Sequence, residues 1–122
     1  MTDATLPIGR LKKRSEFLAC AQAPSVARGA VLVQARPRGD DQPLVRAGFT
    51  ATKRIGGAVD RNRAKRRMRE AVRLLLPGHA RPGCDYVFIA RGGVTTRPWA
   101  RLLDDVKTAL IRLAADRESP HI

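Results

Sequence analysis

The stretch from residue 53 to residue 73, KRIGGAVDRNRAKRRMREAVR, joins a diglycine to a long basic run that is compatible with a helix. Because an α-helix turns about 100° per residue, the polar and apolar residues of this run fall on separate stripes. The basic stripe comprises Asn62, Lys65, Arg66, Arg69 and Arg73, and the apolar stripe comprises Ala64, Met68, Ala71, Val72 and Leu75. One helix can thus pack on a core with one side and bind a polyanion with the other.

The residues on either side of this helix predict a small α/β domain. Helices are expected at 16–22 after a Ser15 cap, from about 58 to the Pro77-Gly78 pair, and from about 96 onward. Strands are expected at 30–36, 44–52 and 85–91, with a further short strand near 25–28. The order α-β-β-(β)-α-β-α is typical of an α+β two-layer sandwich, with one layer of about three helices on a small mixed sheet.

The charge is strongly positive and unevenly distributed along the chain. The sequence holds 24 Lys and Arg against 11 Asp and Glu, and between residues 42 and 84 eleven basic residues face only two acids. Like charges three or four residues apart on a helix repel, so an external anion is expected to compensate them. A membrane surface would require large apolar residues opposite the basic stripe, whereas Met68, Ala71 and Val72 look like core. These features favour nucleic acid over a membrane as the partner.

The length and the N-terminus bound the organisation of the chain. At 122 residues we expect a single RNA-binding domain over 1–122, with flexible ends at 1–9 and 117–122. No apolar run approaches the roughly 20 residues of a membrane span, and the first residues lack an apolar signal core. A cytoplasmic location and no membrane partner are therefore expected.

The titratable residues do not suggest a catalytic site in this chain. His79 is placed in a loop and His121 in the tail, and the pairs Asp40-Asp41 and Asp104-Asp105 are interpreted as solvent-facing acids. Cys20 and Cys84 lack the spacing of a zinc site and are expected to be free buried thiols. We find no positioned base, nucleophile or metal cage that would support hydrolysis by the protein itself.

The central motif and its flanks resemble the bacterial ribonuclease P protein subunit. The motif TKRIGGAV at 52–59 continues as Arg61-Asn62-Arg63, Lys65-Arg66 and Arg69-Glu70. Further matching segments are Arg10-Leu11-Lys12-Lys13 with Phe17, Gly48-Phe49-Thr50, and DYVFIAR at 85–91. The resemblance thus covers nearly the whole chain, apart from the 36–45 turn and the tail.

The resemblance implies a fold and a division of labour. The fold would contain an uncommon left-handed βαβ crossover through the Arg61 helix. In this family an RNA subunit cleaves the 5′ leader from precursor tRNA with Mg²⁺ held mainly by RNA, and the small protein binds both RNAs. The implied chain has no catalytic residues, binds no metal tightly by itself and needs no obligate protein partner. Asn62 and neighbouring carbonyls are its candidates for a Mg²⁺ contact.

The resemblance also implies two binding surfaces. Residues that match the contact motif for the catalytic RNA, with their flanks, are Lys53, Arg54, Arg61, Asn62, Arg63, Lys65, Arg66, Arg69 and Arg73. A cleft between the first helix and the sheet, the leader cleft, would hold the precursor's 5′ leader with Lys12, Lys13, Phe17, Val33 and Arg36. Related proteins often carry further aromatic residues where this chain has Ala21 and Val33, so base stacking is expected to be weaker here.

Two other functions compete with this interpretation. A ribosomal or general RNA- or DNA-binding protein would also present a basic helix, but it would not need Asn62 or the junction between the glycines and the helix. A free-standing nuclease would need the metal ligands that the sequence lacks. Phe17 has an alternative as well, because it fits an ordinary core position.

Overall fold

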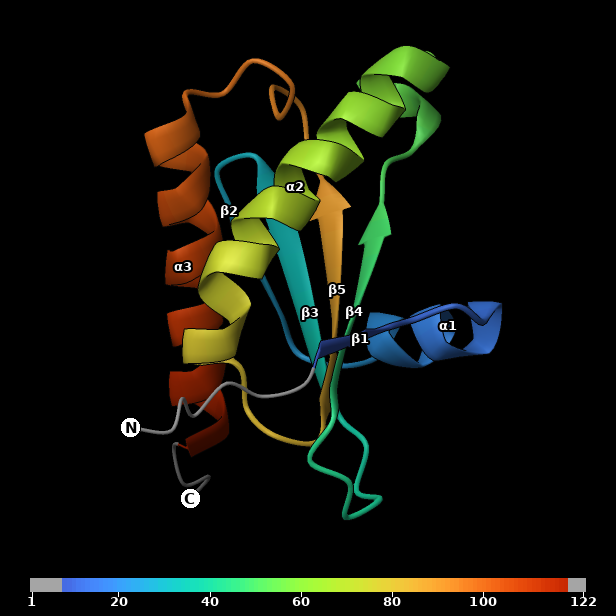
Figure 1. The fold of residues 1–122 in the computed structure, drawn as a ribbon, viewed down its shortest axis with the longest axis vertical. Helices are drawn as coiled ribbons and strands as arrows, with labels where there is room; N and C mark the ends of the chain where they lie inside the picture. The colour runs from blue at the N-terminus through green and yellow to red at the C-terminus, as the bar shows by residue number, and fades with distance from the viewer. Residues whose placement is uncertain (1–7, 119–122) are drawn as a thin grey trace.

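The computed structural model describes residues 8–118 as one sheet flanked by helices (Figure 1). The strands are β1 (Ile8–Arg10), β2 (Ser25–Arg28), β3 (Val31–Pro37), β4 (Val45–Thr50) and β5 (Cys84–Ala90). The helices are α1 (Arg14–Ala21), α2 (Ala58–His79) and α3 (Trp99–Glu118), with a short 3₁₀ helix η1 (Lys53–Ile55) before α2. The predicted α/β fold class is confirmed, including the short strand at Ser25–Arg28.

The sheet is mixed, with the strand order β1-β4-β5-β3-β2. β1 and β5 both pair with β4 in parallel, whereas β3 pairs antiparallel with β5 and with β2. In Figure 1 both β4 and β5 point upward, α2 descends in front of them, and β5 lies to the left of β4. This connection is a left-handed crossover, as the resemblance implied and against the usual preference.

The main core lies between the sheet and the layer formed by α2 and α3. Side chains alternate along the strands, so Val31, Val33 and Ala35 of β3 face this layer and lie buried with Met68 of α2 and Leu102 of α3. The apolar stripe predicted from the sequence is buried at Ala64, Met68, Ala71 and Val72 and half-buried at Leu75. The helical spacing of the apolar residues thus predicted correctly which side of α2 faces the core.

The first helix lies on the other face of the sheet rather than in the same layer. Cys20 of α1 is buried with Leu11 and with Val87 of β5, and Phe17 packs against this small cluster. Val87 and Phe88 are adjacent on β5 and point to opposite faces, since strand side chains alternate. The expectation of a single helix layer is therefore correct for α2 and α3 only.

The ends of the domain and of two helices differ from the expectation. Residues 8 and 9 were expected to be flexible, but they belong to β1 and pair with β4. Residues 117 and 118, also expected to be flexible, continue α3. The remaining terminal residues lie outside the described range. α1 begins at Arg14 rather than after Ser15, and the Glu16 carboxylate accepts the backbone N–H groups of Lys12 and Lys13. α2 runs through Pro77 to His79, so His79 is helical and does not lie in a loop. The helix tolerates Pro77 because a proline near its end removes only one backbone hydrogen bond, and Leu76 stays buried.

Asp105 was expected to face solvent and is instead buried. Its carboxylate accepts two hydrogen bonds from Arg97, at 2.7 and 2.9 Å, and one from the backbone N–H of Ala30 at 3.1 Å. Gly29 allows this contact, because its φ is +53° and an added Cβ would lie 2.3 Å from the Asp105 oxygens. The other three acids of the two Asp-Asp pairs, Asp40, Asp41 and Asp104, are exposed as expected.

The two cysteines are buried thiols that form no disulfide, as predicted. Burial raises the pKa of the Cys20 thiol to about 11. Within residues 8–118, no group of three or more His, Cys, Asp or Glu side chains could hold a metal ion. In the same range, none of the helices has the length and apolar content needed to cross a membrane.

Candidate RNA-binding surface

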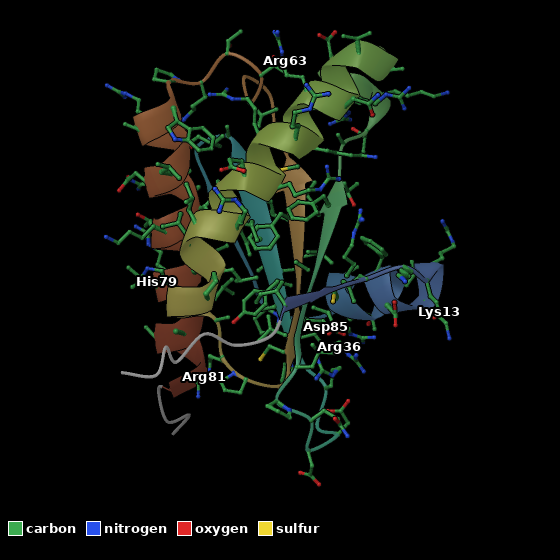
Figure 2. The ribbon with its side chains drawn as sticks, viewed as in Figure 1. Lys13, Arg36, Arg63, His79, Arg81 and Asp85 are labelled. Atoms are coloured by element: carbon green, nitrogen blue, oxygen red, sulfur yellow. The ribbon has the colours of Figure 1, made fainter. Side chains whose placement is uncertain are left out.

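The start of α2 is shaped by the two glycines before it. Gly56 has φ of +142°, and a Cβ there would lie 2.4 Å from a carboxylate oxygen of Asp60. Gly57 is the N-cap residue, and its carbonyl accepts the backbone N–H of Arg61 at 2.9 Å. The chain turns at this junction from β4 into α2. Arg63, near the start of α2, lies at the top of the molecule in Figure 2.

Most cations on the exposed side of α2 have no acidic partner within residues 8–118. Asn62, Arg66, Arg69 and Arg73 of the basic stripe are exposed, and Lys65 is half-buried. Of the residues predicted to bind the catalytic RNA, Arg73 alone pairs with a carboxylate in the part of the chain that the structure describes. The unpaired cations are Lys53, Arg54, Arg61, Arg63, Lys65, Arg66 and Arg69. This surface has the charge and exposure needed to bind phosphates.

Two arginines of α2 make contacts within the protein. Arg73 donates to Glu70, at 3.1 Å from Nε, and this pairing raises the pKa of Arg73 and lowers that of Glu70. Arg67, which the motif leaves outside the contact set, donates to the carbonyls of Val94 and Arg97. Arg67 therefore ties α2 to the loop before α3, and Arg73 is only in part available to an external anion.

Arg69 links the basic stripe to the sheet. Its guanidinium carbon lies 5.4 Å from the centre of the Phe49 ring, which is a cation–π geometry. Phe49 in turn stacks on Phe88, with ring centroids 5.6 Å apart. Phe49, Arg69 and Arg73 also line a groove that extends to Ile8 and Pro77. Arg69 is thus held by an aromatic side chain and remains exposed to a partner.

The leader cleft has a hollow next to the basic stripe. The side chains that line it come from α1 and its approach, from the end of β4, and from α2: Lys12, Arg14, Phe17, Phe49, Thr50, Ala51 and Lys65. Phe17 lies over Gly48, where a Cβ would come within 2.6 Å of its ring. The structure thus brings Lys12 and Phe17 together with Lys65 of the basic stripe. Lys13 is exposed at the outer end of α1 and does not line this hollow (Figure 2).

Val33 was assigned to the leader cleft, and the structure contradicts this. Its side chain is fully buried in the core under α2 and α3, on the opposite face of the sheet from α1. Because strand side chains alternate, the β3 residues on the α1 face are Leu32, Gln34 and Arg36. The alternation of Gln34 and Arg36 with apolar neighbours was the sequence signal that could have shown this.

Arg36 lies on the expected face but belongs to a separate group of charges, the Asp85 cluster, which comprises Asp85, Arg36, Arg38, Arg46 and Glu16. Arg46 donates to both Asp85 oxygens at 2.8 and 2.7 Å, and Arg38 donates to one at 2.8 Å. Arg36 is 3.7 Å from the same carboxylate, as their neighbouring positions in Figure 2 suggest. The buried Asp85 carboxylate thus fixes two arginines and leaves Arg36, which is 36% exposed, more loosely held.

Glu16 extends the Asp85 cluster to the start of α1. Arg46 donates to Glu16 at 2.6 Å, and hydrogen bonding to Asp85 raises the pKa of Arg46. The N–H groups of Lys13 and Lys12, followed by Arg46, lower the pKa of Glu16. Arg38 also donates to the carbonyl of Leu44 at 2.6 Å and so closes the turn between β3 and β4. Sequence reasoning missed these roles of Arg38, Arg46 and Asp85.

Comparisons with known proteins agree with these features. A family model described as Ribonuclease P matches residues 8–114. The "Ribonuclease P protein component" of Caulobacter vibrioides is 71% identical over 112 residues, which are 92% of this chain and 75% of that protein. The component of Ruegeria pomeroyi is 49% identical over 116 residues, 93% of each chain.

Solved structures show the same fold. The ribonuclease P protein from Thermotoga maritima has a TM-score of 0.70 and 26% identity, over 84% of this chain and 96% of that one. The Staphylococcus aureus protein also gives a TM-score of 0.70, at 24% identity and over 86% and 94% of the two chains. The length of the family match and the identity to the bacterial relatives show that this chain belongs to the bacterial ribonuclease P protein family.

Proposed function

We propose that this chain is the protein subunit of a ribonuclease P, which removes the 5′ leader from precursor tRNA together with a catalytic RNA. The observation that carries the proposal is the exposed basic stripe of α2. Apart from Arg73, its lysine and arginines lack acidic partners in the described part of the chain, residues 8–118. A row of such cations along one helix face suits a polyanion with many phosphates better than it suits a small substrate. The precursor is made in the bacterial cytoplasm, so the protein is proposed to act there.

The basic stripe is assigned to the catalytic RNA. Lys53 and Arg54 of η1 are exposed at the start of the same surface and extend it beyond α2. Guanidinium groups bind phosphate oxygens through two donors at once, whereas Lys65 acts as a point charge. This part of the protein supplies affinity and orientation to the complex.

Bond cleavage is assigned to the RNA subunit, and Mg²⁺ is proposed to be held mainly by RNA. Asn62 is the exposed amide of the stripe, and its oxygen is of the type that Mg²⁺ accepts. Its neighbours Arg61, Arg63 and Arg66 are cations and disfavour a divalent cation on the protein alone. Asn62 would therefore contact Mg²⁺ only where RNA phosphates outweigh these charges.

The 5′ leader is assigned to the α1 side of the sheet. Lys12, Arg14 and Lys65 line the hollow around Phe17 with positive charge, and a single-stranded nucleotide can use both the charge and the aromatic ring. Arg36 lies farther along the same face in the Asp85 cluster. The shared residue Lys65 makes the leader cleft continuous with the surface proposed for the catalytic RNA.

Reconstitution tests the proposal. Purified protein, the RNA subunit, precursor tRNA and Mg²⁺ are mixed at near-physiological salt, and each component is omitted in turn. We expect cleavage at the mature 5′ end to need the RNA subunit and to be stimulated by the protein. Cleavage by the protein alone would make it a nuclease in its own right, and the absence of any protein effect would favour a general RNA-binding role.

A further inference from the structure

Trp99 departs from the pattern of its own helix. It begins the apolar stripe of α3, which continues at the fully buried residues Leu102 and Val106. Trp99 lies on the same stripe as these core residues, yet 37% of its surface is exposed. An indole that could be buried for a large gain in free energy is instead left in contact with solvent.

The indole lines a hollow beside the basic stripe. A surface hollow between α2 and the start of α3 is lined by Trp99 together with Arg66, Arg67, Arg69 and Glu70. The guanidinium of Arg67 lies over the Trp99 ring, 5.8 Å from its centroid. Two carbonyls of the 94–97 loop bind the same guanidinium and fix it in this position. The hollow thus has a rigid wall made of an aromatic ring and a cation.

The net charge of the hollow is positive. Glu70 is its acid, and Arg73 donates to the Glu70 carboxylate from outside the hollow. Arg66 and Arg69 have no acidic partner among the described residues. An aromatic platform flanked by two guanidinium groups that have no salt bridge suits a nucleotide, whose base stacks while its phosphate accepts hydrogen bonds.

We infer that Trp99 is a stacking site for an unpaired nucleotide of the catalytic RNA, whose phosphate Arg66 and Arg69 bind. This inference rests on the proposed function, because it takes the basic stripe as the surface for that RNA. The nucleotide must be unpaired, since bases within an RNA helix are not available to a flat surface side chain. The site is separate from the leader cleft, which Phe17 lines from α1.

Intrinsic fluorescence tests the inference without any substitution, because Trp99 is the single tryptophan of the chain. The wild-type protein is titrated with the RNA subunit alone and, separately, with precursor tRNA alone. We expect the RNA subunit to reduce the emission and to protect Trp99 from acrylamide, a neutral quencher. Unchanged emission and quenching in an assembled holoenzyme would overturn the inference and leave the proposed function intact. A response to precursor tRNA alone would overturn the assignment to the RNA subunit.

Substitutions give a second and independent measurement. Trp99→Leu is expected to weaken binding of the RNA subunit by about fivefold, and Trp99→Phe is expected to restore most of the loss. Ile111→Ala is the matched control, because it changes an exposed apolar residue of α3 that does not line the hollow. Equal affinities for Trp99→Leu and Ile111→Ala would overturn the inference. If the wild-type protein failed to bind the RNA subunit at all, the proposed function itself would fail.

Discussion

Arginine serves opposite purposes in the Asp85 cluster and in the basic stripe. In the Asp85 cluster, Arg38 and Arg46 surround a carboxylate with no exposed surface, and their side chains are only 7% and 23% exposed. In the basic stripe, Arg66 and Arg69 are exposed and form no salt bridge with any acid that the structure describes. The first group satisfies its charge inside the protein, whereas the second leaves it available to a partner.

The difference shows that the number of arginines in a segment does not reveal what they do. Buried charges must be paired, because removing them from water costs several kcal/mol per ion. Exposed like charges cost only a few tenths of a kcal/mol per pair, which a domain can tolerate. A partner that neutralises the exposed charges recovers this cost on binding, so the basic stripe is suited to function and the Asp85 cluster to stability.

The largest expected effect is that of Asp85→Asn on stability. This change removes the buried counter-charge that Arg38 and Arg46 share and leaves them only the outer carboxylates of Asp40 and Glu16. The free energy of unfolding should therefore fall by about 3 kcal/mol or more. Urea denaturation followed by circular dichroism measures the loss. Asp104→Asn is the control, because it removes an acid that is 61% exposed and pairs with Arg28 at 3.4 Å. Equal losses in the two variants would mean that the Asp85 cluster is effectively solvated.

Most of the helices and strands and the basic stripe could be predicted from the sequence because their signals are local. The period of α2, the alternation along the strands and the two glycines all lie within a few residues of the elements they specify. The apolar stripe of α2 and the start of α2 at Ala58 were accordingly correct. The same alternation places Val33 in the core. Its assignment to the leader cleft was therefore an error of the alignment to the family, and the sequence held the signal that would have corrected it.

The buried acids could not be predicted in the same way. Asp85 meets Arg46 and Arg38 from 39 and 47 residues away, and Asp105 meets the backbone of Ala30 from 75 residues away. Such pairs exist only after the sheet has formed, and no short window of sequence contains both partners. The adjacent acids Asp104 and Asp105 look alike in sequence, yet one is exposed and the other is buried.

The next effect concerns RNA affinity and leaves stability unchanged. The double variant Arg66→Ala/Arg69→Ala removes two proposed phosphate contacts and should weaken binding of the RNA subunit by about tenfold or more. The slope of log K against log salt concentration should fall by about two units, since each lost contact releases about one fewer counterion. Filter binding at several salt concentrations measures both quantities.

The matched control for this variant is Lys107→Ala/Arg112→Ala, which removes the same charge from exposed positions on α3. It should change the affinity and the salt slope much less, because positions 107 and 112 lie outside the proposed surface and do not line the hollow at Trp99. Equal changes in the two variants would show that net charge, and not the basic stripe, attracts the RNA. A loss of stability in the first variant would place its arginines with those of the Asp85 cluster.

Phe17 lies between the two regions, and a smaller effect is expected from Phe17→Ala. The loss of one stacking partner should weaken binding of leader-bearing precursor tRNA to the holoenzyme by about fivefold and leave mature tRNA nearly unaffected. Leu18→Ala, at a 53% exposed position of the same helix, is the control. Equal losses for precursor and mature tRNA would assign Phe17 to the core alone, since it also packs on Leu11, Cys20 and Val87.

The smallest effect is expected from Glu16→Gln, at the exposed edge of the Asp85 cluster. Backbone N–H groups of Lys13 and Lys12 lower the pKa of Glu16 below its ordinary value of 4.5, so its charge stabilises the fold above that pH. The stabilisation should be lost as the pH falls through the lowered pKa. The free energy of unfolding of the variant should therefore be about 1 kcal/mol lower than that of the wild type at pH 7, and the difference should shrink as the pH falls below 4.5 and through the lowered pKa. A difference that stays constant over this fall in pH would mean that hydrogen-bond geometry, and not the charge of Glu16, secures the start of α1.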